Sequence, residues 1–427
     1  MVSMRTYPAS AYQTLFEENA THLQGGSADR LAALKQVTEQ GIPSRRVENW
    51  KYTDLRQLAE TALPLARPIG DIPDISALAL AQVKSHRLVF VNGHFMASVS
   101  DDLPDGVRFI TLADALGQGA KVLESLDTVE TSTPVQLNAA FMQDGAMLEI
   151  EAKADITDPI HLVYISTGEP SASYVRNVVR CGAGARVTVL ESHLMADECT
   201  SNVVTHLDVA DNASLTHLKV HQGAVGSIHL GNVSTQMGRD ARLNCGLYNF
   251  GGGLARTDSR VTLQHPGAEA RLTGAYLLDG KAHNDNTIVI DHQAPHCRSY
   301  QLFKGALAGT SRGVFQGKVI VAKGAFDTDG QQRCQALLLS ERAEQDIKPE
   351  LEIYNDDVQC AHGATIGQLD EEAVFYLRSR GVPLAEARAL LIRAFLAETV
   401  DDISHEGVRE ALQAAISNWL DHQEDQK

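Results

Sequence analysis

The stretch DDVQCAHGAT, residues 356–365, places a thiol and an imidazole two positions apart, at Cys360 and His362. Side chains at positions i and i+2 share one face of a β-strand, about 6–7 Å apart along the backbone, but point about 200° apart on a helix. The preceding residues LEIYNDDV are typical of a strand, so we expect Cys360 and His362 to face the same way. A thiolate and an imidazole placed like this could share one metal ion.

Two donors do not complete a metal site, because a structural zinc ion or an iron–sulfur cluster normally takes four protein ligands. Distant residues or a second chain would have to supply the others. A hydrolytic dyad is disfavoured, because no oxyanion-hole or third-member pattern accompanies the pair. Taken by themselves, the residues favour the interpretation without chemistry, in which a cysteine is buried and a histidine is hydrogen-bonded.

Cysteine spacing and charge argue against several classes of protein. The six cysteines form no CxxC pair, which argues against a zinc ribbon, a thioredoxin-type site and a self-sufficient iron–sulfur binding run. The formal net charge is −17, so we expect no nucleic-acid partner. The N-terminus lacks the apolar stretch of a signal peptide, and the most apolar helical run, ALLIRAFLA, is too short to span a bilayer. We therefore expect a cytoplasmic protein with no membrane partner.

A repeat of about 28 residues organises the middle of the chain. Turn residues recur before a helix could complete three turns, and the segments between them alternate polar and apolar residues. One residue stands directly before each of these segments, and we use it as the anchor of the repeat. Successive anchors are 28, 28, 29, 27 and 28 positions apart: Ala185, Ala213, Ala241, Ala270, Cys297 and Ala325. Short strands at a near-constant period are typical of a solenoid, in which each coil buries its apolar edge on its neighbours. We therefore predict a mainly β protein with a β-helix core, and an antiparallel sandwich is the alternative.

Helical periodicity at both ends divides the chain into three parts. Residues 1–85 are predicted to be mostly helical, with a Pro-rich connector from about residue 64 to 73 that cannot be regular helix or central strand. Residues 86–368 form the strand-rich region, which contains the coils. Residues 369–427 form a C-terminal helical domain.

Two of the predicted C-terminal helices, residues 370–380 and 384–398, are joined by a Gly-Val-Pro turn. The second helix carries Leu390 and Phe395 among the apolar residues of one face. Such a helical hairpin would cap the solenoid or dock a partner.

Histidines and glycines in the repeat region offer two further candidate sites. Alternation places His217, Lys219 and His221 on one strand face, which we expect to be exposed to solvent. The glycine cluster of NFGGGLARTD, residues 249–258, has neither the GK[ST] ending of a Walker A loop nor GxGxxG spacing, so we interpret it as a solenoid turn and expect no ATP to bind this chain. We expect surface polar residues and not ligands at His193, His206, His217, His221, His229, His265, His283, His292 and His296.

Three stretches carry a family resemblance: PSRRVENWKYTDL at 43–55, RLVFVNGHF at 87–95 and LEIYNDDVQCAHGATIGQLDEEAVFYLRSRG at 351–381. Together with the repeat between them, they resemble the SufB/SufD family of iron–sulfur cluster assembly proteins over essentially the whole chain. The first two stretches are shared by both branches of the family, whereas the third is long and specific. The chain lacks the N-terminal cysteine motif that SufB chains often carry, and it has QCAHGATIG in place of a Glu-rich segment. It is therefore most similar to the SufD branch.

The resemblance implies a fold and a set of partners. The implied fold is a right-handed parallel β-helix between N-terminal and C-terminal helical domains. The implied partners are SufB, as a heterodimer, and the ABC-type ATPase SufC, attached through the C-terminal helices where Leu390 and Phe395 lie. ATP binding would dimerise SufC and open the SufB–SufD interface. The resemblance leaves open whether the isolated chain forms a homodimer and whether a reduced flavin binds the complex.

Carried onto this sequence, the family's functional positions are Cys360 and His362, near the surface where the two paralogues meet. The resemblance implies that His362 is a ligand of transient iron or of an iron–sulfur cluster, opposite a SufB cysteine. It makes Cys360 a weaker ligand candidate or a packing residue. The expected role is a non-catalytic subunit of an ATP-driven assembly complex. The alternatives are a purely structural β-helix scaffold without metal ligation and, ranked below it, a β-helix carbohydrate-active enzyme, a class that is usually exported.

Overall fold

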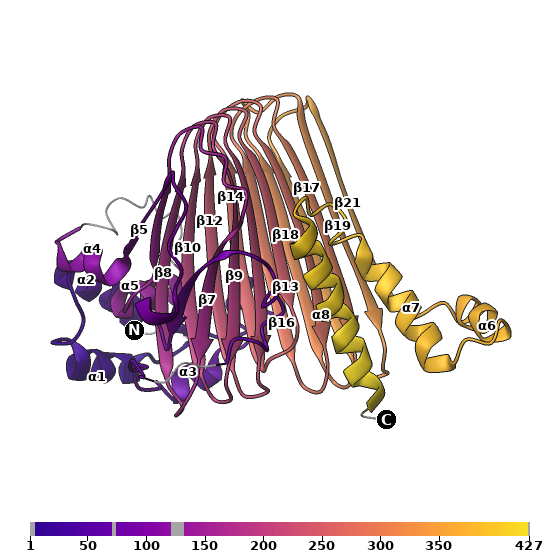
Figure 1. The fold of residues 1–427 in the computed structure, drawn as a ribbon, viewed down its shortest axis with the longest axis horizontal. Helices are drawn as coiled ribbons and strands as arrows, with labels where there is room; N and C mark the ends of the chain where they lie inside the picture. The colour runs from indigo at the N-terminus through magenta and orange to yellow at the C-terminus, as the bar shows by residue number, and fades with distance from the viewer. Residues whose placement is uncertain (1–4, 71–73, 121–131, 426–427) are drawn as a thin grey trace.

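The computed structural model describes residues 5–70, 74–120 and 132–425. Its body is a solenoid of long parallel strands, one per half-coil (Figure 1). The strands of the coils are β6 (Ala146–Ile150), β7 (Ile160–Ser166), β8 (Ala172–Cys181), β9 (Arg186–Met195), β10 (Thr200–Val209), β11 (Ser214–Gly223), β12 (Ile228–Met237), β13 (Arg242–Asn249), β14 (Leu254–Leu263), β15 (Glu269–Leu278), β16 (His283–His292), β17 (Arg298–Leu307), β18 (Arg312–Val321), β19 (Thr328–Leu338), β20 (Glu344–Ile353) and β21 (Val358–Gly367).

Shorter strands precede the coils: β1 (Thr6–Tyr7), β2 (Ile42–Pro43), β3 (His86–Val91), β4 (His94–Phe95) and β5 (Val107–Thr111). Asn92 and Gly93 have φ of 54° and 78° and form the turn that connects β3 to antiparallel β4. The small sheet of β1 and β2 lies apart from the coils.

Successive strands of the solenoid alternate between two sheets. One sheet has nine strands in the order β20-β18-β16-β14-β12-β10-β8-β6-β5, and the other has ten in the order β21-β19-β17-β15-β13-β11-β9-β7-β3-β4. All pairs from β6 and β7 onward are parallel, as in the register of Val187 with Leu215 and of Leu215 with Leu243. These three side chains are buried between the sheets, so each coil covers the apolar residues of the next. The predicted parallel β-helix is confirmed, and the antiparallel sandwich is excluded.

The predicted repeat marks the coils, but its register shifts in the later ones. Its anchors through Ala241 directly precede equivalent strand positions, as the pairing of β9, β11 and β13 shows. Ala270 pairs with Leu243 and therefore lies one residue inside β15. Ala325 lies in a turn, before β19 begins at Thr328. The coil period is thus not constant, because turn lengths vary while the strands keep their stacking.

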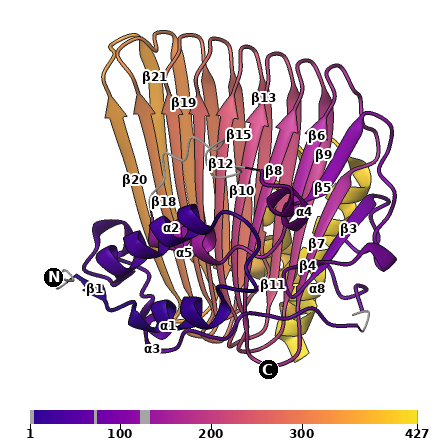
Figure 2. The ribbon, with the colours of Figure 1, turned by 90° about the vertical axis from the view of Figure 1, so that its left-hand side faces the viewer.

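The N-terminal helices cover the outer face of the nine-stranded sheet (Figure 2). They are α1 (Ser10–Asn19), α2 (Ser27–Gln40), α3 (Arg56–Glu60), α4 (Leu112–Gly117) and α5 (Thr133–Phe141), with the short 3-10 helix η1 (Glu48–Trp50). A second 3-10 helix, η2 (Ala97–Val99), lies beside β3 of the ten-stranded sheet. Helix α5 falls within the predicted strand-rich region but packs against α2 and on β8 and β10. Residues 71–73, the end of the predicted Pro-rich connector, lie outside the described residues.

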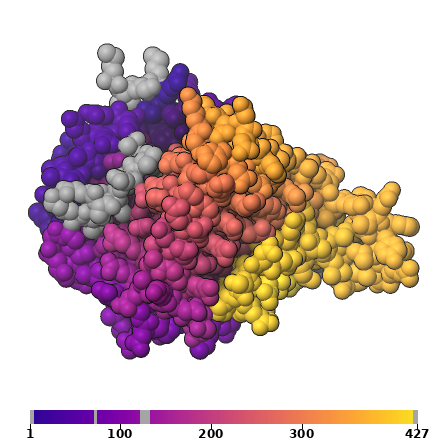
Figure 3. Space-filling view, turned by 90° about the horizontal axis from the view of Figure 1, so that it is seen from above, coloured from indigo at the N-terminus to yellow at the C-terminus, as the bar shows by residue number. Residues whose placement is uncertain are grey.

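The C-terminal helices are α6 (Glu371–Ser379), α7 (Leu384–Ala397) and α8 (Glu406–Asp425). Leu412 and Ile416 of α8 pack on outward-facing Leu218 and Leu277 of the ten-stranded sheet. Helix α8 therefore lies along the side of the coil, and α7 contacts β17. Helix α6 projects away from the body on the side opposite the N-terminal helices (Figure 1, Figure 3). The predicted helical hairpin of α6 and α7 is present, and its second helix packs beside β17 of the ten-stranded sheet. Among the described residues, no helix combines the length and the apolarity needed to cross a membrane.

Candidate functional site

Cys360 and His362 lie in β21, the last strand of the ten-stranded sheet. Their partners in β19 are Gly330 and Gln332. Residues of the same parity in β19, such as Cys334, belong to the core between the sheets. Cys360 and His362 therefore share a strand face, as alternation predicts, and that face is directed to the inside of the coil at its open end.

The thiol of Cys360 is more buried than the imidazole of His362. A Cβ added to Gly330 would come within 3.2 Å of Cys360 Sγ and 3.4 Å of Val319 Cγ1 in the opposite sheet, which places the sulfur between the sheets. Burial raises the pKa of the Cys360 thiol, so the thiol is protonated at neutral pH. A metal bound by Cys360 would have to displace this proton. His362, by contrast, is exposed.

The donor set fits iron in kind but not in number. An imidazole nitrogen and a cysteine sulfur are donor types that bind iron and iron–sulfur clusters. Within residues 5–70, 74–120 and 132–425, no group of three or more His, Cys, Asp or Glu side chains could hold a metal ion. Cys360 and His362 would therefore need ligands from outside the described residues.

The end of the coil that carries this pair has two free strand edges. Among the described strands, β20 pairs with β18 alone and β21 with β19 alone. An unpaired edge presents backbone N–H and C=O groups that can add a strand from another chain. Large apolar side chains are exposed beside these edges, with Ile353, Tyr354 and Ile366 at 41%, 57% and 49% exposure. The surface around Cys360 and His362 thus has the features of a protein-binding edge.

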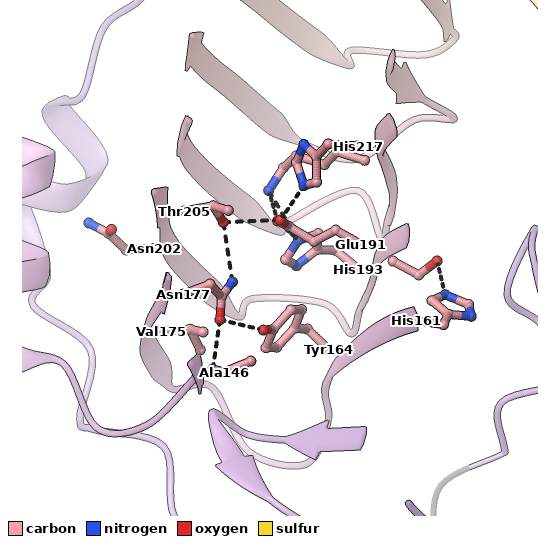
Figure 4. Close-up of polar contacts among 12 residues, drawn as sticks. Ala146, His161, Tyr164, Val175, Asn177, Glu191, His193, Asn202, Thr205 and His217 are labelled. Atoms are coloured by element: carbon pink, nitrogen blue, oxygen red, sulfur yellow. Dashed lines mark hydrogen bonds and ion pairs between the residues drawn. The ribbon is translucent and has the colours of Figure 1, made fainter. Parts of the chain in front are cut away.

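A cluster of charged and polar side chains lies deep inside the coil (Figure 4). Glu191 of β9 is fully buried, and its carboxylate accepts hydrogen bonds from Nε2 of His193 at 2.7 Å and of His217 at 3.1 Å. Lys219 Nζ lies 2.5 Å from the same carboxylate, and the Thr205 hydroxyl donates to it at 3.0 Å. Burial by itself would raise the pKa of Glu191, but Lys219 and the imidazole N–H groups hold it well below its ordinary value. The cluster is therefore a buried ion pair.

Sequence reasoning missed this cluster, although a signal for it exists. Glu191 and Lys219 are 28 positions apart, one repeat period, and they pair directly in register on β9 and β11. Opposite charges at the same position of adjacent coils predict an ion pair along the stack. Only the knowledge that this strand face points inward would have shown that the pair is buried.

The expectation that His217, Lys219 and His221 face solvent is wrong. They share a face, but that face points into the coil, where they are 0%, 3% and 3% exposed. The other face of β11 is buried as well, because Leu218 packs beneath the C-terminal helices. A strand covered on both sides has no polar-out pattern from which its orientation could be inferred. Of the nine histidines that were expected to be surface residues, six are buried: His193, His206, His217, His221, His229 and His292.

The glycine cluster is a turn between β13 and β14, as predicted. Gly251 and Gly252 have φ of 98° and 115°, which favours glycine. A Cβ on Gly252 would lie 2.9 Å from Cε1 of His221, so the glycine also makes room for the buried imidazole.

The PSRRVENWKYTDL stretch anchors the N-terminal helices to the nine-stranded sheet. The Arg256 guanidinium of β14 lies 3.8 Å from the Trp50 ring centroid, in a cation–π contact. The same guanidinium pairs with Asp258 at 2.7 Å and Asp285 at 2.8 Å. Thr53 donates a hydrogen bond to Asp285, which closes the network. This stretch therefore has a structural role at a buried interdomain seam.

Leu390 and Phe395 lie on different sides of α7. Leu390 is 37% exposed and lines a groove of about 660 Å³ with Ala394 and with Ile416 of α8. Phe395 packs toward the sheet, where Lys304 Nζ lies 4.6 Å from its ring centroid and donates to its carbonyl oxygen at 2.8 Å. Positions five apart on a helix differ by about 140° in direction, so the predicted common face does not exist. Leu390 is available to a partner, and Phe395 is part of the packing.

Comparison with known proteins gave two family matches and a set of full-length relatives. The family described as "SUF system FeS cluster assembly, SufBD core domain" matches residues 164–395, and the "SufBD protein N-terminal region" matches residues 7–162. The chain is similar to the iron–sulfur cluster assembly protein SufD of Escherichia coli, with 30% identity over 394 residues and 91% of each chain covered. It is 32% identical over 412 residues to an iron–sulfur cluster assembly SufBD family protein of Synechocystis, with 92% of this chain and 89% of the relative covered. The protein SufD of Bacillus subtilis is 25% identical over 403 residues, with 91% and 92% covered.

Proposed function

Because the chain belongs to the SufBD family of iron–sulfur cluster assembly proteins, we propose that it is a SufD-type subunit that pairs with a SufB-type paralogue at the open end of its coil and contributes a ligand there for iron or a nascent cluster. The observation that supports this most directly is the position of His362 and Cys360 together on the last strand, beside a free edge. Iron held at that edge would have this chain on one side and the paralogue on the other.

His362 is the primary ligand in this proposal, and Cys360 is the secondary one. The imidazole is exposed, whereas the thiol is half-buried and its pKa is raised by burial. Two donors cannot hold a cluster without help, so the paralogue would supply the others. A cluster with shared ligands loses part of its coordination when the two chains separate. Shared ligation therefore suits a cluster that is to be passed on.

The groove between α7 and α8 is the proposed attachment site of the ABC-type ATPase SufC. An exposed leucine in a largely apolar groove between helices is typical of a docking site for a partner element. ATP would bind to that partner, and the present chain would act as an assembly subunit with no turnover of its own. The free edges of β20 and β21 also allow two copies of the chain to pair when the paralogue is absent.

The direct test replaces His362 with alanine in the complex co-expressed with its SufB-type and SufC-type partners. Iron and acid-labile sulfide per complex are measured after purification, and subunit composition is measured by gel filtration. We expect a loss of several-fold in cluster content with an intact complex. His265→Ala is the matched control, because His265 is an exposed histidine in a turn of the coil, and it should leave cluster content unchanged. Cys360→Ala should have the smaller effect of the two site variants.

A normal rate of cluster formation in the His362→Ala complex would refute the ligand role. The chain would then be a scaffold that holds its partners without binding iron. If neither partner co-purified with the unsubstituted chain, the proposed pairing itself would be refuted.

A further inference from the structure

One row of side chains leads from His362 into the interior of the coil. In register, His362 of β21 lies beside Gln332 of β19, and Gln332 lies beside Gln301 of β17. The next member of the row is Leu272 of β15, which belongs to the apolar core. Two glutamines thus separate His362 from the core of the solenoid.

Both glutamines are buried inside the coil. Gln332 is 4% exposed and Gln301 is 0% exposed. Neither the oxygen nor the nitrogen of either amide has a partner among the described residues. An unpaired polar group in a protein interior is destabilising, whereas an apolar side chain of similar shape is not. The stability of the coil therefore does not explain why amides occupy this row.

The opposite sheet is shaped to accept the Gln332 amide. A Cβ on Gly317 of β18 would lie 1.7 Å from Nε2 of Gln332, so no other residue than glycine leaves room for the amide where it lies. The amide thus reaches across the coil and is held between two strands. Its position is built into the fold near the end where His362 lies.

We propose that Gln332 is a positioning residue for His362, whose amide oxygen accepts the N–H of one imidazole nitrogen and so directs the other nitrogen to bound iron. Neighbouring strands are about 4.8 Å apart, and the two side chains leave the sheet on the same face, which puts the imidazole within reach of the amide. A histidine that binds a metal almost always donates its other N–H to an oxygen acceptor, which fixes the tautomer and raises the basicity of the ligand. This inference rests on the proposed function, because it assigns His362 the ligand role.

The test measures Fe²⁺ binding under anaerobic conditions, on the complex with the SufB-type partner, together with the thermal unfolding midpoint of the full chain. Gln332→Met removes the acceptor but keeps the length of the side chain. It should weaken Fe²⁺ binding by about 10- to 100-fold. The unfolding midpoint should stay equal to that of the parent or rise, because the substitution removes the unpaired amide of Gln332. Opposite responses of binding and stability are the signature of a positioning role.

Two further variants separate positioning from packing. Gln332→Glu keeps an acceptor oxygen at the same place, so it should retain Fe²⁺ binding within a few-fold while its unfolding midpoint falls. Gln301→Met is the matched control, since its amide is equally buried and unpaired but lies about 10 Å from His362, two strand spacings away. It should leave Fe²⁺ binding unchanged.

The outcomes distinguish this inference from the proposed function. If His362→Ala abolishes Fe²⁺ binding while Gln332→Met binds Fe²⁺ like the parent, the positioning role is refuted and the ligand role stands. If His362→Ala binds Fe²⁺ like the parent, both are refuted. If Gln332→Met lowers the midpoint and leaves binding intact, the amide has a structural role only, and the inference is wrong.

Discussion

Replacing Lys219 with methionine is expected to leave a charged carboxylate buried inside the coil without its counter-ion. Lys219 Nζ lies 2.5 Å from Glu191 Oε1, and the two side chains are 3% and 0% exposed. At an effective dielectric constant of about 20, two unit charges at this distance attract by about 6–7 kcal/mol. The loss is smaller than this value, because His193 and His217 keep their hydrogen bonds to the carboxylate. We expect Lys219→Met to lower the free energy of unfolding by about 3–5 kcal/mol.

A second substitution identifies the cause of this loss. Glu191→Gln removes the negative charge and keeps one oxygen, which can accept from only one of the two histidines, because His193 and His217 bond to different carboxylate oxygens. By itself it leaves Lys219 unpaired and should also cost about 3–5 kcal/mol. The double variant Glu191→Gln/Lys219→Met contains no buried charge at this place. It should therefore be more stable than either single variant.

The assay is equilibrium denaturation followed by circular dichroism, with the four proteins arranged as a double-mutant cycle. Lys281→Met, at an exposed lysine, is the control and should change the free energy of unfolding by no more than about 0.5 kcal/mol. If Lys219→Met costs less than about 1 kcal/mol, or if the double variant loses the sum of the two single losses, the buried ion pair is not what stabilises this part of the coil.

Acidification from pH 7 to 5.5 should lower the free energy of unfolding by about 1 kcal/mol for each interior histidine whose pKa is lowered by burial. The reason is that histidines of the unfolded chain, with pKa values near 6.5, take up protons in this range before those of the folded chain do. Denaturation at the two pH values measures the change, and an unchanged free energy of unfolding would contradict it. The pKa is lowered to about 3 or 4 at His161, His193, His221 and His292. Leu390→Glu should reduce recovery of the ATPase partner in a pull-down without unfolding the chain. Leu384→Glu, at an exposed residue outside the α7–α8 groove, should leave that recovery unchanged. Equal recovery from both variants would argue against the groove as the attachment site. Trp50→Ala removes the ring over Arg256, and it should lower the free energy of unfolding by about 3–5 kcal/mol and speed limited proteolysis of the N-terminal helices. Unchanged proteolysis would show that this contact does not anchor the helices.

Much of the fold could be predicted, because it depends on periodicities that are local in the sequence. The 28-residue repeat predicts stacked coils, since a short strand with an apolar edge is stable only against its neighbours. The turn at Gly381 and Pro383 predicts the break between α6 and α7, and that break is present. The repeat interval does not locate the strand starts near Ala270 and Ala325, because turn length varies without changing how the strands stack.

The candidate site was predicted only in part, for a reason that the pair itself illustrates. That Cys360 and His362 share a strand face follows from their spacing, but the environment of that face does not. Gln332 is 30 positions before His362 in the sequence and becomes its neighbour only through the register of β19 with β21. No local pattern connects the two residues.

The sequence by itself determined the coiled architecture, the helical ends and the spacing that aligns a thiol with an imidazole, because each of these is written in residues close together along the chain. The tertiary structure decided which strand faces point inward. His217 and Lys219 alternate like residues of a solvent-facing strand, yet both faces of β11 are covered, one by the opposite sheet and the other by α8. It also decided that Leu390 lines an open groove while Phe395 packs toward the sheet, because the sheet occupies one side of α7. These outcomes depend on contacts between segments far apart in the chain, which no local periodicity contains.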